Sequence, residues 1–268
     1  MKVWDDVSIL KEQKNLCIAL GTFDGVHVAH RALLESCLNE AEKRGFESVV
    51  YTFMNHPSTT LNPDDPEEVL TTLKEKTAIF EDMGFDHLVT IYFDEEFAAL
   101  TPKAFVEQLL YEGSERILCC GFDYRFGAEG AGDVETLKAL SEELHFTLLV
   151  QEAVMDGEEI VSSTAIREAL RKGNLEKAAQ LLGWPYGGTV KDFGREHSGP
   201  TARSIYGLME NKIGPRAGDY RIRVTYDVEG TTDVFEAGVY GRNVTIMDPD
   251  GKIPYENKIY YVVFEELL

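Results

Sequence analysis

The chain has 268 residues, and its 47 acidic and 26 basic side chains give a formal net charge of −21. Apolar residues make up 44% of the sequence, which is enough for a real core and argues against wholesale disorder. No apolar run approaches the roughly 18 residues of a membrane span, and the negative field does not favour nucleic acid. We therefore expect one large or two unequal domains, with neither a membrane nor a nucleic-acid partner.

The N-terminus and the cysteines predict the cellular compartment. No apolar run follows Lys2, so the start of the chain does not look like a signal peptide. The sequence has four cysteines, at positions 17, 37, 119 and 120, with no CxxC pair and no disulfide-like spacing. This usage is typical of a reduced, cytoplasmic protein.

Strand patterns alternate with helical patterns up to about residue 184. The expected strands are 15–20, 48–53, 87–92, 117–120 and 147–152. The expected helices are 28–43, 68–83, 101–111, 134–144, 163–171 and 175–182. Such alternation predicts an α/β domain with a doubly wound, Rossmann-like parallel sheet. Ligands of these sheets bind at the carboxyl ends of the strands, beside a reversal of strand order.

A different pattern follows Trp184. Alternating apolar and polar segments are separated by turn signals, and they occupy 220–226, 234–240, 243–247 and 258–264. We expect an α/β domain over residues 1–184 and a small antiparallel, barrel-like β domain over residues 185–268. The formal charge is −18 in the first and −3 in the second.

The first motif, GTFDGVHVAH, lies between the first expected strand and the first expected helix. Gly21 allows a tight turn as the strand ends. His27 and His30 lie three residues apart, so both imidazoles share one side of a first helical turn. The unpaired N–H groups of that turn and the helix dipole suit a polyphosphate. A metal pair is the alternative, but no cysteine or third histidine lies nearby in the sequence.

The second motif, VSSTAIR, follows the fifth expected strand. Hydroxyl side chains crowd the start of a helix, which by itself is typical of an N-cap. Arg167 lies one turn further on. Hydroxyls, backbone N–H groups and a guanidinium together predict a clamp for a leaving pyrophosphate; the residues are Ser162, Ser163, Thr164 and Arg167.

Two further strand ends carry aromatic and polar residues together. TFMNHP closes the second expected strand and contains His56. GFDYRFG closes the fourth and is followed by GAG. Aromatic residues at strand ends commonly belong to the core. Interleaved with Asp123, Arg125 and glycines, they also suit a planar aromatic ligand with a polar tail.

Together these motifs resemble the bacterial bifunctional riboflavin kinase/FAD synthetase family. GTFDGVHVAH is similar to that family's GxFDGVHxGH, TFMNHP to its TFxPHP-like strand end, and SSTAIR to its SSTxIR. LTTLKEK and FDEEF resemble its connecting segments, and GFDYRFG with GAG resembles its flavin-side loop. The resemblance covers residues 15–185 in order.

The resemblance implies an FMN adenylyltransferase of the nucleotidyltransferase superfamily. Such an enzyme transfers AMP from ATP to FMN with Mg²⁺ and gives FAD and pyrophosphate. The implied catalytic residues are His27, His30 and Arg167. The implied ATP- and phosphate-binding residues are Gly21, Phe23, Asp24, Ser162, Ser163 and Thr164. The implied flavin-binding residues are His56, Asp123, Arg125, Phe126 and Gly127. Mg²⁺ or a ribose would contact Asp24 or Asp123.

The sequence departs from the family in two places. Ala29 replaces the glycine of HxGH, the smallest change possible there, and we expect activity to survive it. The family's kinase domain is a six-stranded barrel with the motif GRxxGFPTAN, and here the matching stretch reads GREHSGPTAR. Ser198, Gly199 and Arg203 replace glycine, phenylalanine and asparagine. Arginine supplies no oxygen for a hard cation, and the domain looks short. We therefore expect riboflavin kinase activity to be weak or lost.

Other functions compete with this interpretation. Full bifunctionality is one, a cytidylyltransferase for a small phosphorylated alcohol is a second, and a non-catalytic flavin- or nucleotide-responsive regulatory protein is a third. In each case a chain of this charge cannot attract anionic ligands through its overall field. It must use helix starts, Mg²⁺ and a few placed cations, for which the candidates are His27, His30, Arg125 and Arg167.

Overall fold

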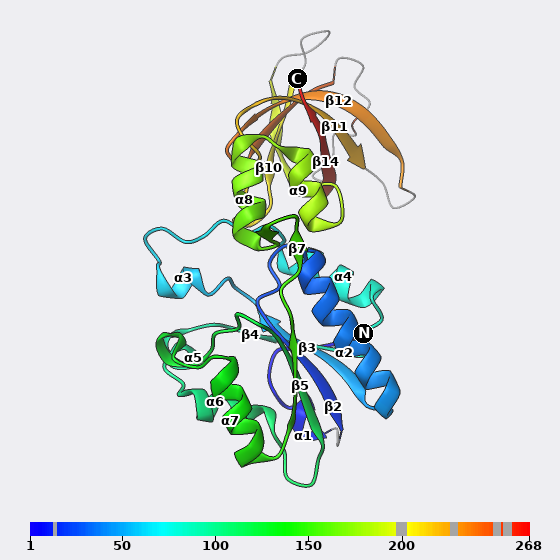
Figure 1. The fold of residues 1–268 in the computed structure, drawn as a ribbon. Helices are drawn as coiled ribbons and strands as arrows, with labels where there is room; N and C mark the ends of the chain where they lie inside the picture. Colours follow the sequence, from blue (N-terminus) through cyan, green and yellow to red (C-terminus); the bar gives the residue numbers. More distant parts are fainter. Residues whose placement is uncertain (13–14, 197–202, 226–229, 249–252, 254–258) are drawn as a thin grey trace. The chain divides into compact units, whose positions relative to one another are not determined.

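The computed structural model describes the whole chain except residues 13–14, 197–202, 226–229, 249–252 and 254–258. The chain divides into two compact units (Figure 1). The first contains residues 1–67 and 73–155, and the second contains residues 68–72 and 156–268. Among the described residues, no helix has the length and apolar character needed to cross a bilayer.

The first unit contains a six-stranded sheet in which all neighbouring strands are parallel. The strand order is β1-β4-β3-β2-β5-β6. The strands are β1 (Lys2–Trp4), β2 (Leu16–Leu20), β3 (Glu47–Phe53), β4 (His87–Ile91), β5 (Arg116–Gly121) and β6 (Thr147–Gln151). From β2 the chain proceeds outward through β3 and β4, and it then crosses to β5 on the other side of β2. The predicted doubly wound parallel sheet is thus confirmed.

Helices cover both faces of this sheet because its central strands are apolar on both faces. Every residue of β2 is buried. Ile18 and Leu20 pack with α1 (Ile9–Glu12), α6 (Pro102–Leu109) and α7 (Val134–Leu144). Cys17 and Ala19 pack with α2 (Val28–Arg44) and α4 (Leu73–Asp82). Two short helices, α3 (Ser58–Leu61) and α5 (Glu95–Ala98), complete this unit.

The second unit contains a closed antiparallel barrel, which confirms the predicted barrel-like domain. Its order is β10-β13-β12-β11-β14-β9. Four strands match the predicted segments: β11 (Gly218–Thr225), β12 (Thr232–Tyr240), β13 (Asn243–Met247) and β14 (Ile259–Leu267). The sequence pattern did not predict β9 (Gly187–Glu196) and β10 (Arg203–Leu208). Their pairing contains a bulge between Ile205 and Tyr206, which disturbs the two-residue alternation that identifies strands.

Helices α8 (Ser163–Lys172) and α9 (Leu175–Leu182) belong to the same compact unit as the barrel. The Arg216 N–H donates to the Leu170 carbonyl at 2.8 Å. The barrel begins at β9, close to the boundary expected at residue 184, whereas the compact units divide at residues 155 and 156. A short sheet of β7 (Met155–Asp156) and β8 (Glu159–Ile160) lies at that division.

Residues 68–72 are not the helical turn expected at the start of 68–83. Val69 pairs in parallel with Lys212, and its N–H donates to the Asn211 carbonyl at 2.8 Å. The buried Lys212 ammonium donates to the Leu70 carbonyl at 2.5 Å. These contacts satisfy backbone groups that a helix would otherwise pair. Helix α4 therefore begins only at Leu73.

Candidate functional site

Two of the predicted motifs, GTFDGVHVAH and GFDYRFG, lie at the ends of neighbouring strands. Strands β2 and β5 pair directly, with Leu16 opposite Arg116 and Ala19 opposite Cys119. Residues 21–27 follow β2, and residues 122–127 follow β5. The strand order reverses between these two strands, so the turns flank the position where parallel α/β sheets bind ligands.

The turn after β2 has a strained and closely packed backbone. Phe23 and Val26 have positive φ angles of 51° and 38°, although neither is a glycine, and both side chains are buried. The Phe23 ring lies against Gly21 so closely that a Cβ at residue 21 would approach ring carbons to 2.9 Å. Non-glycine residues with positive φ persist where the surrounding structure fixes them, commonly at functional sites. Gly21 therefore makes room for the ring that holds this turn.

His27 caps helix α2. Its Nδ1 accepts a hydrogen bond from the His30 N–H at 3.3 Å, and its backbone is extended, as an N-cap requires. An accepting Nδ1 places the proton of the neutral ring on Nε2. The cap thus fixes the orientation of the His27 ring.

The His30 ring stacks on the His27 ring at a centroid distance of 3.6 Å and makes a T-shaped contact with the Phe23 ring. Within the described residues, the buried His30 Nδ1 has no hydrogen-bond partner. The pKa of His30 lies well below its usual value, mainly because the ring is buried. The nearby His27 and Lys76 lower it further by electrostatic repulsion. The ring is therefore neutral at pH 7, and the expectation that His30 supplies a placed cation is wrong. What it supplies is a neutral ring with an unsatisfied nitrogen.

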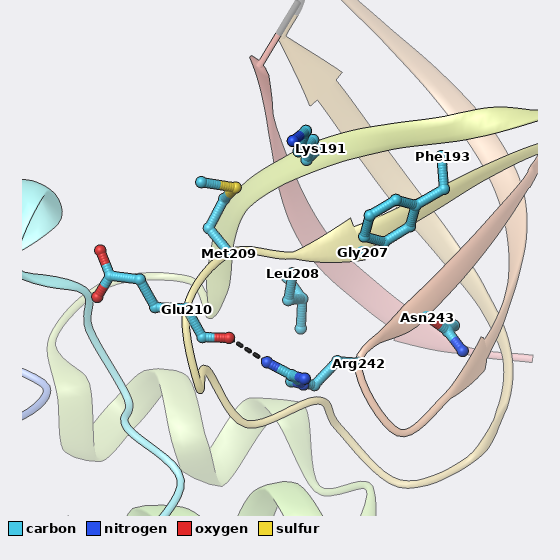
Figure 2. Close-up of a pocket in the computed structure, with 8 residues that line it drawn as sticks. All are labelled: Lys191, Phe193, Gly207, Leu208, Met209, Glu210, Arg242 and Asn243. Carbon is cyan, nitrogen blue, oxygen red and sulfur yellow. Dashed lines mark hydrogen bonds between the residues drawn. The ribbon is translucent and has the colours of Figure 1, made fainter. Parts of the chain in front are cut away.

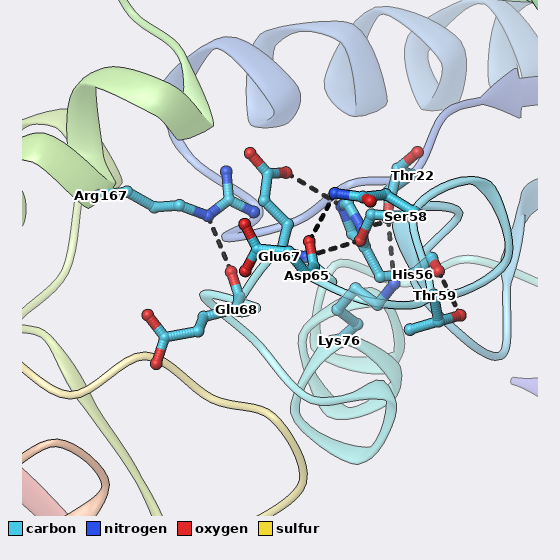
Figure 3. A network of polar contacts seen from close by, with 10 residues as sticks. Thr22, His56, Ser58, Thr59, Asp65, Glu67, Glu68, Lys76 and Arg167 are labelled. Atoms are coloured by element: carbon cyan, nitrogen blue, oxygen red, sulfur yellow. Dashed lines mark hydrogen bonds and ion pairs between the residues drawn. The ribbon is translucent and has the colours of Figure 1, made fainter.

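Lys76 is the buried cation that the sequence analysis missed. Its ammonium donates to the Thr22 carbonyl at 3.0 Å, directly before the strained residue Phe23 (Figure 3). The Thr52 hydroxyl donates to the same carbonyl at 3.1 Å. Lys76 precedes the buried Phe80 by one helical turn, and this spacing is the signal that could have placed it on the inner face of α4.

Asp24 and Asp123 lie in the two neighbouring turns. Asp24 is buried in the turn after β2, whereas Asp123 is exposed after β5. Carboxylate oxygens are the protein ligands that Mg²⁺ accepts, usually one or two beside waters and substrate phosphates. The donor chemistry of both turns therefore fits Mg²⁺.

The turn after β5 places its two phenylalanines in opposite environments. Phe126 is 6% exposed and packs against Phe105 and Tyr124 in the core. Phe122, which the sequence analysis did not select, is 41% exposed. Phe126 thus supports the turn from within, and Phe122 is the aromatic ring that is accessible to a ligand.

Arg125 and Gly127 of that turn both lie close to other residues of the first unit. The exposed Arg125 lies 3.6 Å from the Asp133 carboxylate. Gly127 has a φ of 71°, and a Cβ there would meet Pro102 at 2.8 Å. Glycine is required at this position, so Gly127 shapes the turn through its backbone.

His56 lies in a polar network beyond the end of β3. Its Nδ1 is 2.7 Å from the Ser58 hydroxyl, and its Nε2 is 3.7 Å from the Glu67 carboxylate (Figure 3). The Ser58 hydroxyl also accepts the Glu67 N–H at 2.9 Å. These contacts fix the orientation of the His56 ring.

The second motif opens helix α8 in the other unit. Ser162 is the N-cap, and its hydroxyl accepts the Ala165 N–H at 3.2 Å. Thr164 is exposed, and Ser163 is half-buried. The first turn of α8 therefore presents the hydroxyl of Thr164 to solvent, while that of Ser162 stabilises the helix.

Arg167 is only 3% exposed, and it contacts the backbone of the 68–72 segment. Its Nε donates to the Glu68 carbonyl at 2.8 Å (Figure 3). Arg171, one turn later, is exposed and lies 3.9 Å from the Glu68 carboxylate. The sequence motif predicts a guanidinium that is placed to bind anions. In the structure, Arg167 also connects α8 to the 68–72 segment.

The barrel carries surface cavities of its own. One is lined by residues of β9, β10 and the turn before β13, where Arg242 donates to the Glu210 carbonyl (Figure 2). A second contains the exposed Arg203, together with Asp219 and Glu236. The substituted positions Ser198 and Gly199 lie outside the described residues, as do Pro200, Thr201 and Ala202.

Comparisons with known proteins found relatives that share most of this chain. The FAD synthetase family model matches residues 9–165. A bifunctional riboflavin kinase/FMN adenylyltransferase of Listeria monocytogenes is 33% identical over 251 residues, 91% of this chain and 76% of that protein. A protein of the same description from Escherichia coli K12 is 34% identical over 218 residues, which are 79% of this chain and 69% of that protein.

One solved structure has the same fold. The crystal structure of a protein described as a macrolide-efflux protein from Streptococcus pneumoniae superposes with a TM-score of 0.82. It covers 100% of this chain and 90% of that chain at 22% identity. At this identity the likeness concerns the fold alone.

Proposed function

This chain belongs to the FAD synthetase family, and we propose that it transfers AMP from ATP to FMN at the turns that end β2 and β5. A phosphate oxygen of FMN attacks the α-phosphorus of ATP, the bond to the bridging oxygen breaks, and pyrophosphate leaves. FMN is itself the nucleophile, so no covalent enzyme intermediate is needed. The observation that carries the proposal is the pairing of β2 with β5 at the reversal of strand order, which brings the two turns together.

His27 and His30 bind ATP phosphate oxygens in this proposal. The cap hydrogen bond to Nδ1 of His27 fixes the orientation of that ring, and the unsatisfied Nδ1 of His30 gains a partner when ligand binds. The turn that precedes them is fixed before substrate arrives by Gly21, Phe23 and Lys76. Such preorganised donors stabilise developing charge without the cost of reorganisation.

Mg²⁺ has a place in this proposal beside the phosphates. Asp24 and Asp123 would hold it, directly or through water, because their carboxylates lie in the two turns. When bound, the ion neutralises phosphate charge. The side chains of this chain then orient the attacking and leaving oxygens.

Flavin binding is proposed for the turn after β5 and for His56. Asp123 and Arg125 are the polar candidates because both are exposed. The buried Phe126 and the backbone of Gly127 hold the shape of the turn, and Phe122 adds an exposed ring that could stack on a flavin. His56 lies in its own network after β3.

Pyrophosphate binding is proposed for the start of α8. The hydroxyls of Ser163 and Thr164 and the N–H groups of the first turn are the binding groups, and Ser162 holds that turn by capping it. Arg167 adds positive charge from the next turn, in the position fixed by its bond to the Glu68 carbonyl.

We further propose that riboflavin kinase activity is weak or lost. The support is Arg203, whose guanidinium lines a barrel cavity at the position where the resembled motif has asparagine. A guanidinium has donors only and cannot ligate Mg²⁺. The six strands form a closed barrel, so the barrel fold itself is intact. The expected loss of kinase activity therefore comes from the substituted motif.

Separation of flavins after reaction tests both proposals. The full chain is incubated with MgCl₂ and either FMN or riboflavin, with ATP or CTP as the nucleotide. We expect equal amounts of FAD and pyrophosphate from FMN with ATP, and little product in the other three mixtures. Failure to form FAD from FMN and ATP contradicts adenylyl transfer. A product formed with CTP indicates a cytidylyltransferase, and FMN formed from riboflavin contradicts the proposal of weak kinase activity.

A further inference from the structure

Three thiols converge in the core of the first unit. The Cys37 Sγ lies 3.4 Å from the Cys17 Sγ, which lies 3.6 Å from the Cys119 Sγ. All three sulfurs lie within 4.8 Å of one another, and all three side chains are fully buried. Residues 17, 37 and 119 are far apart in the sequence, so their cysteine spacing gave no sign of this cluster.

The fold explains the convergence. Cys17 on β2 and Cys119 on β5 belong to the sheet face covered by α2, and Cys37 belongs to α2 itself. Cys120 follows directly on β5, and its side chain packs into the core on the opposite face. The chain therefore contains three clustered thiols and one buried thiol that is not part of the cluster.

We propose that Cys17, Cys37 and Cys119 form a binding site for a trivalent thiophilic ion that takes three sulfur ligands, with arsenite as its probe. The reaction is a condensation without any change of oxidation state. Three S–H bonds and three As–OH bonds break, three As–S bonds form, and three water molecules leave. No oxidant or reductant is needed.

Geometry favours a pyramidal three-coordinate ion. With a metal–sulfur bond of about 2.3 Å, sulfur pairs separated by 3.4 and 3.6 Å subtend about 95° and about 103° at a shared ion. Both angles lie below the 120° of a regular planar site, and the sulfurs of the third pair, Cys37 and Cys119, lie within 4.8 Å of each other. Among the described residues, the group of converging metal-ligating side chains has three members, so it lacks the fourth ligand of a structural zinc site.

Charge favours the same ion. The cluster lies among apolar side chains, including Leu34 and Ile117, where an uncompensated charge is costly. A complex of As(III) with three thiolates has no net charge. The same three thiolates would give a net charge of −1 with Zn²⁺ and of −2 with Cu⁺. Because the thiols are buried, binding requires transient local opening around α2.

Native mass spectrometry of the reduced full chain after arsenite treatment tests the proposal. We expect the wild type to gain the mass of one arsenic atom less three hydrogens. Cys120→Ala, which removes the other buried thiol, should gain the same mass, and Cys37→Ala should not. Because a bound ion ties β2, α2 and β5 together, arsenite should also raise the Tm of the wild type and of Cys120→Ala.

The outcomes that overturn the proposal are separate from those of the flavin assay. A wild type without an adduct, or with an adduct that loses only two hydrogens, contradicts three-sulfur binding. If Cys37→Ala still gains one arsenic less three hydrogens, or if Cys120→Ala fails to gain it, then arsenic binds other thiols and the proposal is wrong. If Cys37→Ala does not fold, Cys119→Ala replaces it, and the wild-type mass and Tm decide independently.

Discussion

The imidazole rings of His27 and His30 are stacked with a centroid distance of 3.6 Å and an angle of 14° between their planes. Two protonated rings at this distance would repel each other, so each ring disfavours a charge on the other. Burial and Lys76 act on His30 in the same direction. His30 is therefore a neutral imidazole, and Lys76 is a buried positive charge beside the turn.

The lowered pKa of His30 predicts a pH-dependent contribution to stability. The unfolded chain, with a histidine pKa of about 6.5, binds a proton more readily than the folded chain. His30 thus costs no stability above pH 6.5, and stability is lost as the pH falls below that value, by up to about 1.4 kcal/mol per pH unit. Urea unfolding of the wild type and of His30→Gln at pH 7.5, 6.5 and 5.5 measures this loss. A difference between the two proteins that stays constant with pH contradicts it.

Lys76→Met should slow FAD formation and raise the pKa of His30. The substitution removes the hydrogen bond to the Thr22 carbonyl and the charge that disfavours protonation of His30. Thr52 still donates to that carbonyl, so we expect the loss of stability to stay near 1–2 kcal/mol. Steady-state kinetics and an NMR titration of His30 measure the effects. An unchanged pKa of His30 would refute the electrostatic role of Lys76.

Gly21→Ala should disturb the turn after β2. The new Cβ would approach the Phe23 ring to 2.9 Å, and the ring is fully buried, so overpacking should cost about 1–3 kcal/mol. Gly238→Ala is the matched control, because its Cβ meets only Asp219 at an ordinary 3.6 Å. Urea unfolding of both variants provides the comparison. Equal free energies of unfolding for the two variants contradict this account of the turn.

Arg167→Gln and Arg171→Gln form a second matched pair on α8. Arg167 is buried and donates to the Glu68 carbonyl, whereas Arg171 is exposed and lies near the Glu68 carboxylate. We expect Arg167→Gln to lose about 1–3 kcal/mol of stability and to form FAD more slowly. Arg171→Gln should change stability by less than about 0.5 kcal/mol, since exposed ion pairs contribute little. Thermal unfolding and FAD assays measure both effects, and similar losses in the two variants would contradict the role given to Arg167.

Much of the fold could be predicted from local patterns. The apolar run of β2 and the glycine that follows it identified the central strand, and the alternation of strands and helices identified the doubly wound sheet. The segment 68–72 could not be identified, because its backbone pairs with Lys212, more than 140 positions away, rather than within a helix. Strands β9 and β10 were missed where a bulge interrupts their pairing.

The sequence motifs identified residues of the candidate site, but they did not predict the burial and charge of those residues. Sequence spacing brought His27 and His30 to one helical turn, yet it gave no information on the stacking and burial that make His30 neutral. The two phenylalanines of GFDYRFG look alike in the sequence, and only packing distinguishes the buried Phe126 from the exposed Phe122. The role of Lys76 depends on a contact with a loop 54 positions away.

The central claim is that FAD is made at the turn that carries His27 and His30, and the rate of FAD formation from FMN and Mg-ATP by His30→Ala tests it most directly. The control is His145→Asn, at an exposed left-handed position that asparagine tolerates. We predict that His30→Ala lowers kcat by about 10²–10³-fold, as the loss of one charge-stabilising group does elsewhere, while His145→Asn keeps the wild-type rate. A folded His30→Ala protein with the wild-type rate would contradict the account.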